Sequence, residues 1–271
     1  MSDFRLDHLS HTQVRTYLIC GVRYYLRYRR GLIVPPSAAM TLGSATDQAA
    51  NANYRQKIHT GEDLPARDLE EIFVEDLQAR REETIWTPAD GDGYQQVETQ
   101  GRKMIRVMRE DLMPGVQPAG VQEKIEFGFE NDAVTFIGYS DLRTGAGSVG
   151  GEAVVDLKTS TRVPTIEGNV MQMTGYVIGS RLCFGMQSRK AGIHAVIRSK
   201  KTGDCYATKA NLEFEITEED EKFWLWKVQS ALKGIRAGIF NPAADASQCN
   251  PRWCGYWKIC RAQNKGGQDE I

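Results

Sequence analysis

The spacing of apolar residues along this chain alternates between helical and extended patterns. Apolar side chains recur at helical intervals in residues 10–30, 66–83, 97–112, 166–184 and 218–239. Runs rich in β-branched and aromatic residues predict strands at 121–129, 133–140, 152–158, 193–198 and 205–208. Small residues from Gly43 to Ala50 predict the opening of one more helix, with Asp47 in its early turns. The pattern therefore predicts a chain that mixes helices with a meander of strands near its middle.

Two charged residues interrupt the apolar pattern of the strand predicted at 152–158. Side chains alternate along a strand, so Asp156 and Lys158 share one face. Val155 and Leu157 pack on the opposite face. The strand therefore presents a carboxylate and an ammonium group side by side.

A second extended run, 134–141, ends in another carboxylate, Asp141. The glycine-rich segment 144–151 predicts a turn between the two runs, and such a hairpin would bring Asp141 beside Asp156. Two carboxylates and the carbonyl of Leu157 form a hard oxygen site suited to Mg²⁺ or Mn²⁺. An adjacent lysine could orient a water molecule, which is the chemistry of metal-assisted phosphodiester hydrolysis.

The bare pattern of an acid, a spacer and a lysine also occurs at Asp220-Glu221-Lys222, in a predicted solvent-facing helix. Charged residues mostly lie outside, so a surface ion pair is the ordinary interpretation of such a tripeptide. The hairpin and the partner carboxylate Asp141 favour the functional interpretation for Asp156 and Lys158.

Charge gives no global sign of a nucleic-acid partner, because 34 Lys and Arg residues balance 35 Asp and Glu. One local basic segment interleaves Arg23, Arg27, Arg29 and Arg30 with Tyr24, Tyr25 and Tyr28. These residues could stack bases and bind phosphate, or the tyrosines could be core residues beneath a solvated cationic face. No apolar run approaches the roughly 20 residues of a membrane span. We expect a cytoplasmic protein with no membrane contact.

The chain has six cysteines, and three of them gather near the C-terminus: Cys249, Cys254 and Cys260. A fourth thiolate would complete a tetrahedral zinc site or a four-cysteine iron-sulfur cluster, and Cys20 is the candidate because it also neighbours aromatic and basic residues. The alternative is a set of unligated thiols in a tryptophan-rich surface loop. The spacing by itself leaves iron and zinc both open.

The motifs follow one another as Leu9 to Tyr25, Gly43 to Asp47, Gly138 to Asp141, Asp156 to Lys158, Gln172 to Tyr176, and the C-terminal cysteines. In this order they resemble the RecB-like PD-(D/E)XK nucleases, specifically the iron-sulfur group that includes the AddB nuclease domain and the CRISPR-associated Cas-four exonucleases. The resemblance implies an α/β fold with a restriction-endonuclease-like core, a central mixed sheet flanked by helices, and a C-terminal cysteine-cluster appendage. It divides the chain into a nuclease domain (1–240), a cluster segment completed by Cys20 (241–262) and a flexible tail (263–271).

The same resemblance implies roles for individual residues. Asp141 and Asp156 would ligate the catalytic metal, and Lys158 would assist the nucleophilic water. Gln172 and Tyr176 match the family's Gln-x-x-x-Tyr helix, which borders the active site and contacts DNA. The family also implies a [4Fe-4S] cluster on four thiols: Cys20, Cys249, Cys254 and Cys260.

Two features depart from the family's pattern. Asp47 occupies the position where the family usually has a histidine, and it could offer an oxygen ligand in its place. Four residues separate Cys249 from Cys254 where two are usual, and Gly21 stands where proline commonly follows the first cysteine.

These observations predict a Mg²⁺- or Mn²⁺-dependent DNase, an exonuclease on single strands or duplex ends, with an iron-sulfur appendage. Two alternatives remain: a noncatalytic DNA-binding adaptor that keeps the nuclease fold, and a zinc-stapled structural protein. A homo-oligomer, or a partner in recombination, CRISPR adaptation or phage genome processing, is compatible with each.

Overall fold

The computed structural model describes residues 6–130, 132–199, 202–208, 212–244, 247 and 249–263. The chain divides into two compact units. One, here called the sheet unit, comprises Pro35–Phe127 and Gly138–Glu221. The other, the terminal unit, comprises Met1–Val34, Gly128–Ile137 and Lys222–Ile271. In the described part of the chain, no helix is long and apolar enough to cross a membrane.

The sheet unit is built on a mixed sheet in which β3, β4, β5 and β6 are neighbours in that order, while β2 pairs with β3 and β7 with β5. These strands are β2 (Pro118–Gly128), β3 (Thr135–Thr144), β4 (Ala153–Ser160), β5 (Lys190–Arg198), β6 (Cys205–Thr208) and β7 (Glu213–Glu215). Strands β3 and β4 run antiparallel, as a tight turn allows. Strands β4 and β5 run parallel, because helix α6 (Ile166–Phe184) makes the crossover between them.

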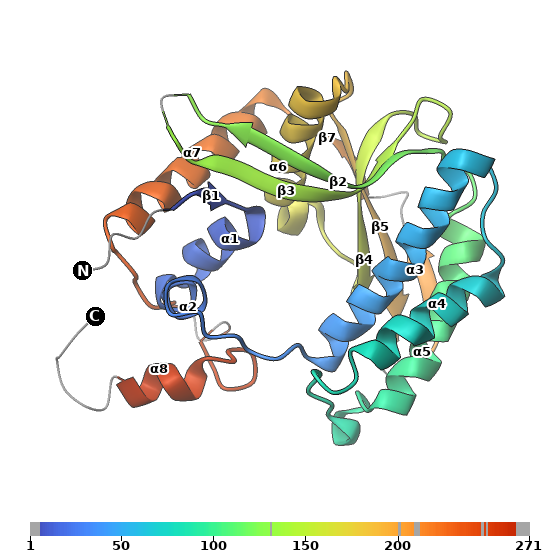
Figure 1. Cartoon of the computed structure of the whole chain (residues 1–271), viewed down its shortest axis with the longest axis horizontal. Helices are drawn as coiled ribbons and strands as arrows, with labels where there is room; N and C mark the ends of the chain where they lie inside the picture. The colour runs from blue at the N-terminus through green and yellow to red at the C-terminus, as the bar shows by residue number, and fades with distance from the viewer. Residues whose placement is uncertain are drawn as a thin grey trace. The chain divides into compact units, whose positions relative to one another are not determined.

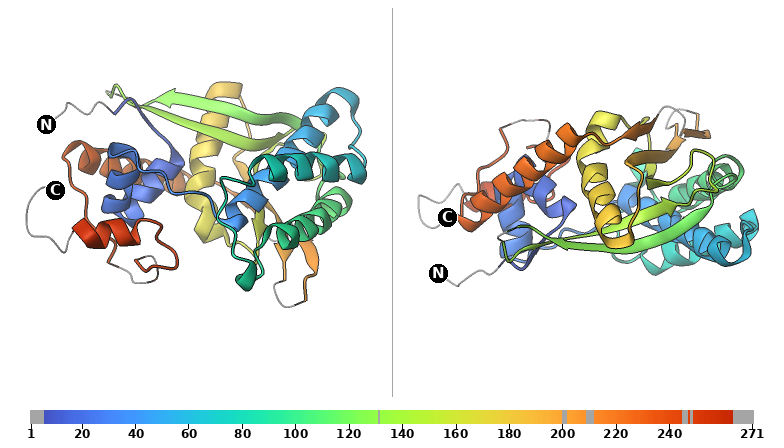
Figure 2. Two further views of the ribbon diagram at one scale, coloured as in Figure 1. Left: turned by 60° about the horizontal axis from the view of Figure 1, so that its bottom comes forward. Right: turned by 90° about the horizontal axis from the view of Figure 1, so that it is seen from above.

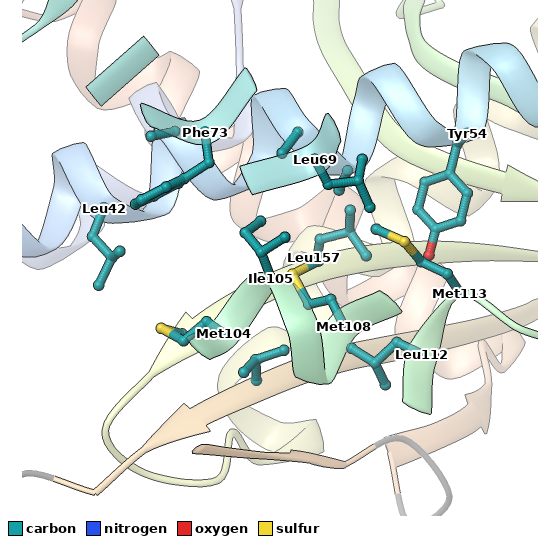
Figure 3. Close-up of a cluster of buried hydrophobic side chains, with 14 of the residues drawn as sticks. Leu42, Tyr54, Leu69, Phe73, Met104, Ile105, Met108, Leu112, Met113 and Leu157 are labelled. Carbon is teal, nitrogen blue, oxygen red and sulfur yellow. The ribbon is translucent and has the colours of Figure 1, made fainter. Parts of the chain in front are cut away.

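Three helices form a layer on one face of this sheet, as Figure 1 shows in blue to green. They are α3 (Ala38–Thr60), α4 (Ala66–Ala79) and α5 (Tyr94–Val107), with the short 3-10 helix η2 (Pro88–Asp90) before α5 and the π-helix η3 (Met108–Leu112) after it. Their apolar faces meet Leu157 of β4 in one buried cluster, seen in Figure 3. Helices α4 and α5 approach closely there, because a Cβ on Gly101 would lie 1.9 Å from Cζ of Phe73. Burial of this cluster holds β4 against the helical layer.

Helix α6 covers the opposite face of the sheet. Met173 and Val177 of α6 pack on Val154 of β4 in a second apolar cluster. The helix also approaches β2 closely, since a Cβ on Gly179 would lie 1.8 Å from Cγ2 of Ile125. This close packing fixes the distance between the strands and the residues of α6 that face them.

The terminal unit consists mainly of helices: α1 (His11–Ile19), α2 (Gly21–Tyr24), the π-helix η1 (Tyr25–Arg29), most of α7 (Glu218–Arg236), and α8 (Trp257–Gln263). The short strand β1 (His8–Leu9) pairs in parallel with the first residues of β3. Tyr24 is fully buried and stacks on Phe240. Position 21 requires a glycine, because a Cβ added there would lie 2.7 Å from the backbone nitrogen of Asn241.

The element types predicted from the pattern agree with the structure, and several boundaries differ. Residues 10–30 form a broken pair of helices, interrupted at Cys20. The helix carrying Asp47 begins at Ala38, so Asp47 lies deep inside it rather than in its early turns. Strand β3 continues past Asp141 to Thr144. Strands β1 and β7 and helix α8 were not anticipated, and residues 264–271 of the predicted tail lie outside the described residues.

The tyrosines and arginines of the basic segment at residues 23–30 differ in how deeply they are buried. Tyr24 belongs to the core, whereas Arg27 and Arg30 are exposed. This arrangement matches a packed tyrosine layer beneath a solvated cationic face.

Candidate active site

The β3–β4 hairpin brings together the two carboxylates that the sequence singled out. The ladder between β3 and β4 ends with Leu142 opposite Val155. Continued by one residue, this register brings Asp141 to Asp156, and the two carboxyl groups interact with one another. The backbone N–H of Leu157 donates to Oδ2 of Asp141 at 3.1 Å. The predicted pairing of Asp141 with Asp156 is therefore confirmed.

Asp156 is the buried centre of this group, with 1% of its surface exposed. Nε2 of Gln172 donates to its Oδ1 at 2.8 Å. Nζ of Lys158 lies 2.7 Å from its Oδ2, in an ion pair. Burial raises the pKa of Asp156 to about 6, against the opposing effect of the Lys158 ammonium and with a further rise from the carboxylate of Asp141.

Asp47 approaches the same group from helix α3. Its pKa is raised well above the ordinary range, first by burial and then by the carboxylates of Asp141 and Asp156. The ammonium of Lys158 opposes this rise. Three carboxyl groups, Asp47, Asp141 and Asp156, are thus close enough to act on one another's charge, with the single ammonium of Lys158 among the groups that act on them. This excess of acidic groups in a partly desolvated setting suits a divalent cation.

Among the residues that the structure describes, no group of three or more His, Cys, Asp or Glu side chains has the geometry to hold a metal ion. The oxygens of Asp156 face Gln172 and Lys158, and those of Asp141 face Leu157 and Gln122. The donor set itself, carboxylates with a neighbouring backbone carbonyl, has the hard oxygen chemistry that Mg²⁺ and Mn²⁺ take. The residues present therefore fit such an ion chemically.

Helix α6 contributes the two side chains expected of it. Gln172 holds Asp156 directly, and Tyr176 lies one helical turn further along the same face. Burial raises the pKa of Tyr176 to about 12, with additional effects from Asp141 and Asp156. Both residues therefore border the carboxylate pair, with the phenol kept neutral at ordinary pH.

Gln122 is a member of this site that the sequence did not reveal. Its Nε2 donates to Oδ1 of Asp141 at 3.1 Å, and its backbone has a φ of 51°. The residues around Gln122 follow a strand-like pattern, and this pattern does not predict a left-handed backbone conformation at Gln122. Of the two acids in this strand, Glu123 pairs with Arg143 and Glu126 pairs with Lys124, so neither is turned to the carboxylate pair.

The second copy of the acid and lysine pattern has a structural role. Asp220 accepts hydrogen bonds from the backbone N–H and the hydroxyl of Thr217 at the start of α7. Glu221 forms ion pairs with Arg181 and Arg189. The ordinary interpretation of Asp220-Glu221-Lys222 is confirmed.

The four cysteines that the sequence grouped line one pocket of the terminal unit: Cys20, Cys249, Cys254 and Cys260. Cys20 lies at the break between α1 and α2, where its sulfur accepts from the backbone N–H of Arg23. Burial raises the pKa of the Cys260 thiol, and so do the other three cysteines, while Arg261 opposes the rise. Cys183 is exposed, donates to the carbonyl of Glu126 and is not among the residues that line this pocket. Residues from both ends of the chain line this pocket, those of α1 and α2 on one side and those of α8 on the other. Figure 2 shows these segments close together, in blue and in red.

Comparison with known families adds one finding. A sequence model described as the PD-(D/E)XK nuclease superfamily matches residues 8–261. The matched range runs from β1 into α8 and includes both the carboxylate site and the four grouped cysteines. A search of curated proteins gave no match.

Proposed function

Because this chain belongs to the PD-(D/E)XK nuclease superfamily, we propose that it is a divalent-metal-dependent deoxyribonuclease with its active site at the β3–β4 hairpin. The observation that carries this proposal is the placement of Asp141 opposite Asp156, with Lys158 2.7 Å from the buried carboxylate. A structural ion pair would need one acid and one base. Three neighbouring carboxyl groups with a single lysine beside the buried one are instead typical of a cation site.

Asp141 and Asp156 would hold the cation through their carboxylates, with the carbonyl of Leu157 and the carboxylate of Asp47 as further oxygen donors. A divalent cation bound there would supply Lewis acidity toward phosphate oxygens and water. Lys158 is a third exposed, so its ammonium can orient the attacking water and place positive charge beside the phosphate. Gln172 holds the Asp156 carboxylate in the required orientation.

DNA is the proposed substrate, cleaved from single-stranded or duplex ends. Family membership supports a nucleic-acid phosphodiester as the substrate class. The sequence resemblance to end-processing nucleases supports the exonuclease mode, and Tyr176, beside the carboxylates, would contact the strand.

The grouped cysteines support a second part of the proposal, a [4Fe-4S] cluster that binds residues 241–262 to Cys20. Four thiols lining one pocket provide the ligand number of such a cluster or of a zinc ion. The resemblance to the iron-sulfur nucleases favours iron.

Digestion of end-labelled single-stranded and duplex DNA with Mg²⁺, Mn²⁺ or EDTA tests the proposal, with the parent compared to Asp156→Ala. We expect metal-dependent release of short products that the substitution abolishes. A parent that retains its cluster and binds DNA without cutting it would favour the adaptor alternative. Colourless protein that contains zinc, after preparation without oxygen, would favour a zinc-stapled protein.

A further inference from the structure

Gln122 has an unusual backbone for its residue type. Its φ of 51° is the single positive value among non-glycine residues in the described part of the chain. Residues with a Cβ adopt this left-handed region at an energetic cost, and such residues concentrate at functional sites. A glycine would adopt the same conformation freely.

The left-handed residue changes which face of the sheet the following side chains occupy. Val121 packs in the cluster under the helices α3, α4 and α5. With unbroken alternation Ile125 would point to the same face, but it packs against Gly179 of α6 on the opposite face. One extra residue in the strand, a β-bulge, accounts for the change.

The neighbouring glycine supports the same interpretation. A Cβ on Gly120 would lie 1.8 Å from Oε2 of Glu123, so these two residues share a face although three positions separate them. In a regular strand they would point to opposite faces. The irregularity is therefore confined to Val121 and Gln122.

The bulge aims the Gln122 amide at the candidate active site. Nε2 of Gln122 donates to Oδ1 of Asp141 at 3.1 Å, while the backbone N–H of Leu157 donates to Oδ2 at 3.1 Å. Two donors, one on each oxygen, fix the plane of the carboxylate and oppose its rotation. Each oxygen accepts one hydrogen bond from these donors, so each retains acceptor capacity for a cation.

We infer that Gln122 is a positioning residue that holds the Asp141 carboxylate in the orientation required to bind the divalent cation, with the β-bulge as the device that aims it. This inference rests on the proposed nuclease function. Residues that orient metal ligands typically change metal affinity or activity 10–100-fold when replaced. A glycine at position 122 would relieve the backbone strain, but it would lose the side-chain amide that bonds to Asp141. The hydrogen bond to Asp141 therefore accounts for a glutamine at this strained position.

The test compares Gln122→Gly and Gln122→Met with the parent. Three quantities are measured: the urea midpoint in EDTA, the Mn²⁺ dissociation constant by calorimetry, and kcat and KM for DNA cleavage. Gln122→Gly should raise the urea midpoint and yet weaken Mn²⁺ binding about 10-fold or more. Gln122→Met keeps the length of the side chain without its donor, and it should weaken Mn²⁺ binding and kcat to a similar degree with KM for DNA unchanged.

Lys124→Gly is the matched control, because it places a glycine in the same strand at an exposed residue whose ion pair is with the exposed Glu126. It should lower the urea midpoint and leave Mn²⁺ binding as in the parent. If both Gln122 variants bind Mn²⁺ and cut DNA as the parent does, the positioning role is wrong and the nuclease stands. If the parent neither binds Mn²⁺ nor cuts DNA, the proposed function fails, and this inference with it.

Discussion

Gln172 and Asp156 join helix α6 to strand β4 through a hydrogen bond of 2.8 Å between Nε2 and Oδ1. The acceptor is buried, and its other oxygen is paired with Lys158. The orientation of the Asp156 carboxylate therefore depends on a helix that packs on the sheet through entirely different residues, Met173 and Val177.

Replacing Gln172 with Ala should lower the rate of DNA cleavage about 10–100-fold with little loss of fold. The carboxylate would lose its neutral donor and turn further toward Lys158. Cleavage of end-labelled DNA at saturating Mg²⁺, together with circular dichroism, measures the effect. Asn169→Ala is the control, since Asn169 lies one turn earlier on α6 and its side chain donates to the carbonyl of Thr165 rather than to Asp156. Equal losses in both variants would contradict a specific role for Gln172.

Removing the Asp156 charge should stabilise the protein when no metal is present. A pKa raised to about 6 by burial means that the ionised carboxylate disfavours the folded state at pH 8. Asp156→Asn should therefore raise the free energy of unfolding by about 1 kcal/mol in EDTA. The shift itself represents roughly 3 kcal/mol and already includes the attraction of Lys158. The stabilisation is smaller than this because the amide of the variant is itself a buried polar group that must be desolvated.

Urea titration of the parent and of Asp156→Asn at pH 8 measures this difference. With EDTA the variant should have the higher midpoint. With excess Mn²⁺ the parent should gain stability through binding, whereas the variant should gain little. A variant that is less stable than the parent in EDTA would show that the carboxylate is a structural group.

Sequence patterns went far in predicting the carboxylate site, because its geometry is local. Alternation along two strands and one glycine-rich turn suffice to place Asp141 beside Asp156. The position of Gln172 beside Asp156 depends on how helix α6 crosses over the sheet. This position was predicted from the order of motifs in the family that the sequence resembles. Gln122 could not be predicted, because its left-handed conformation results from packing on both faces of the sheet. The spacing of apolar residues along the sequence carries no information on such packing.

The boundaries of the fold were less predictable for a similar reason. Helix α3 begins at Ala38 because Ser37 caps it, accepting from the backbone N–H of Met40, whereas the glycine at position 43 suggested a later start. Strand β7 has three residues, Glu213–Glu215, and it forms because these residues pair with the backbone of β5. Short elements of this kind depend on their tertiary partners and carry little pattern of their own.

Gly179→Ala should disturb the site from a distance. The new Cβ would lie 1.8 Å from Cγ2 of Ile125, so α6 must move away from β2 or Ile125 must change its rotamer. We expect the free energy of unfolding to fall by about 1–3 kcal/mol, with a matching drop in cleavage because Gln172 moves with the helix. Gly168→Ala, exposed in the first turn of α6, should be neutral or slightly stabilising. A Gly179→Ala protein as stable as the parent would contradict the close packing of α6.

Loss of one grouped thiol should release the metal that we propose the four cysteines bind. Cys260→Ser should reduce the iron or zinc content per chain and lower the thermal midpoint, because the proposed centre links α8 to Cys20. Elemental analysis of protein purified without oxygen measures the content. Cys183→Ser is the control, since Cys183 is exposed outside the pocket. Equal metal content in parent and Cys260→Ser would exclude Cys260 as a ligand.

Asp132 and Arg236 give a prediction for the terminal unit that is independent of any metal. The guanidinium donates two hydrogen bonds of 2.7 Å to the carboxylate, and the backbone N–H of Val134 adds a third contact. The Arg236 hydrogen bonds, followed by that of Val134, lower the pKa of Asp132. A carboxylate whose folded pKa is depressed stabilises the fold above its unfolded pKa of about 4, and this contribution is lost as the pH falls through the folded value.

Asp132→Asn should therefore reduce the free energy of unfolding by up to about 1 kcal/mol at pH 7, a modest amount since Arg236 is about half exposed. The difference from the parent should stay constant down to about pH 5 and shrink below about pH 4, where the parent carboxylate takes up its proton. Urea midpoints from pH 7 to pH 3 measure this convergence. Glu126→Gln removes an exposed ion pair with Lys124 and should show no such dependence. A gap between parent and Asp132→Asn that persists unchanged at pH 3 would mean that packing, rather than the charge on Asp132, accounts for the loss.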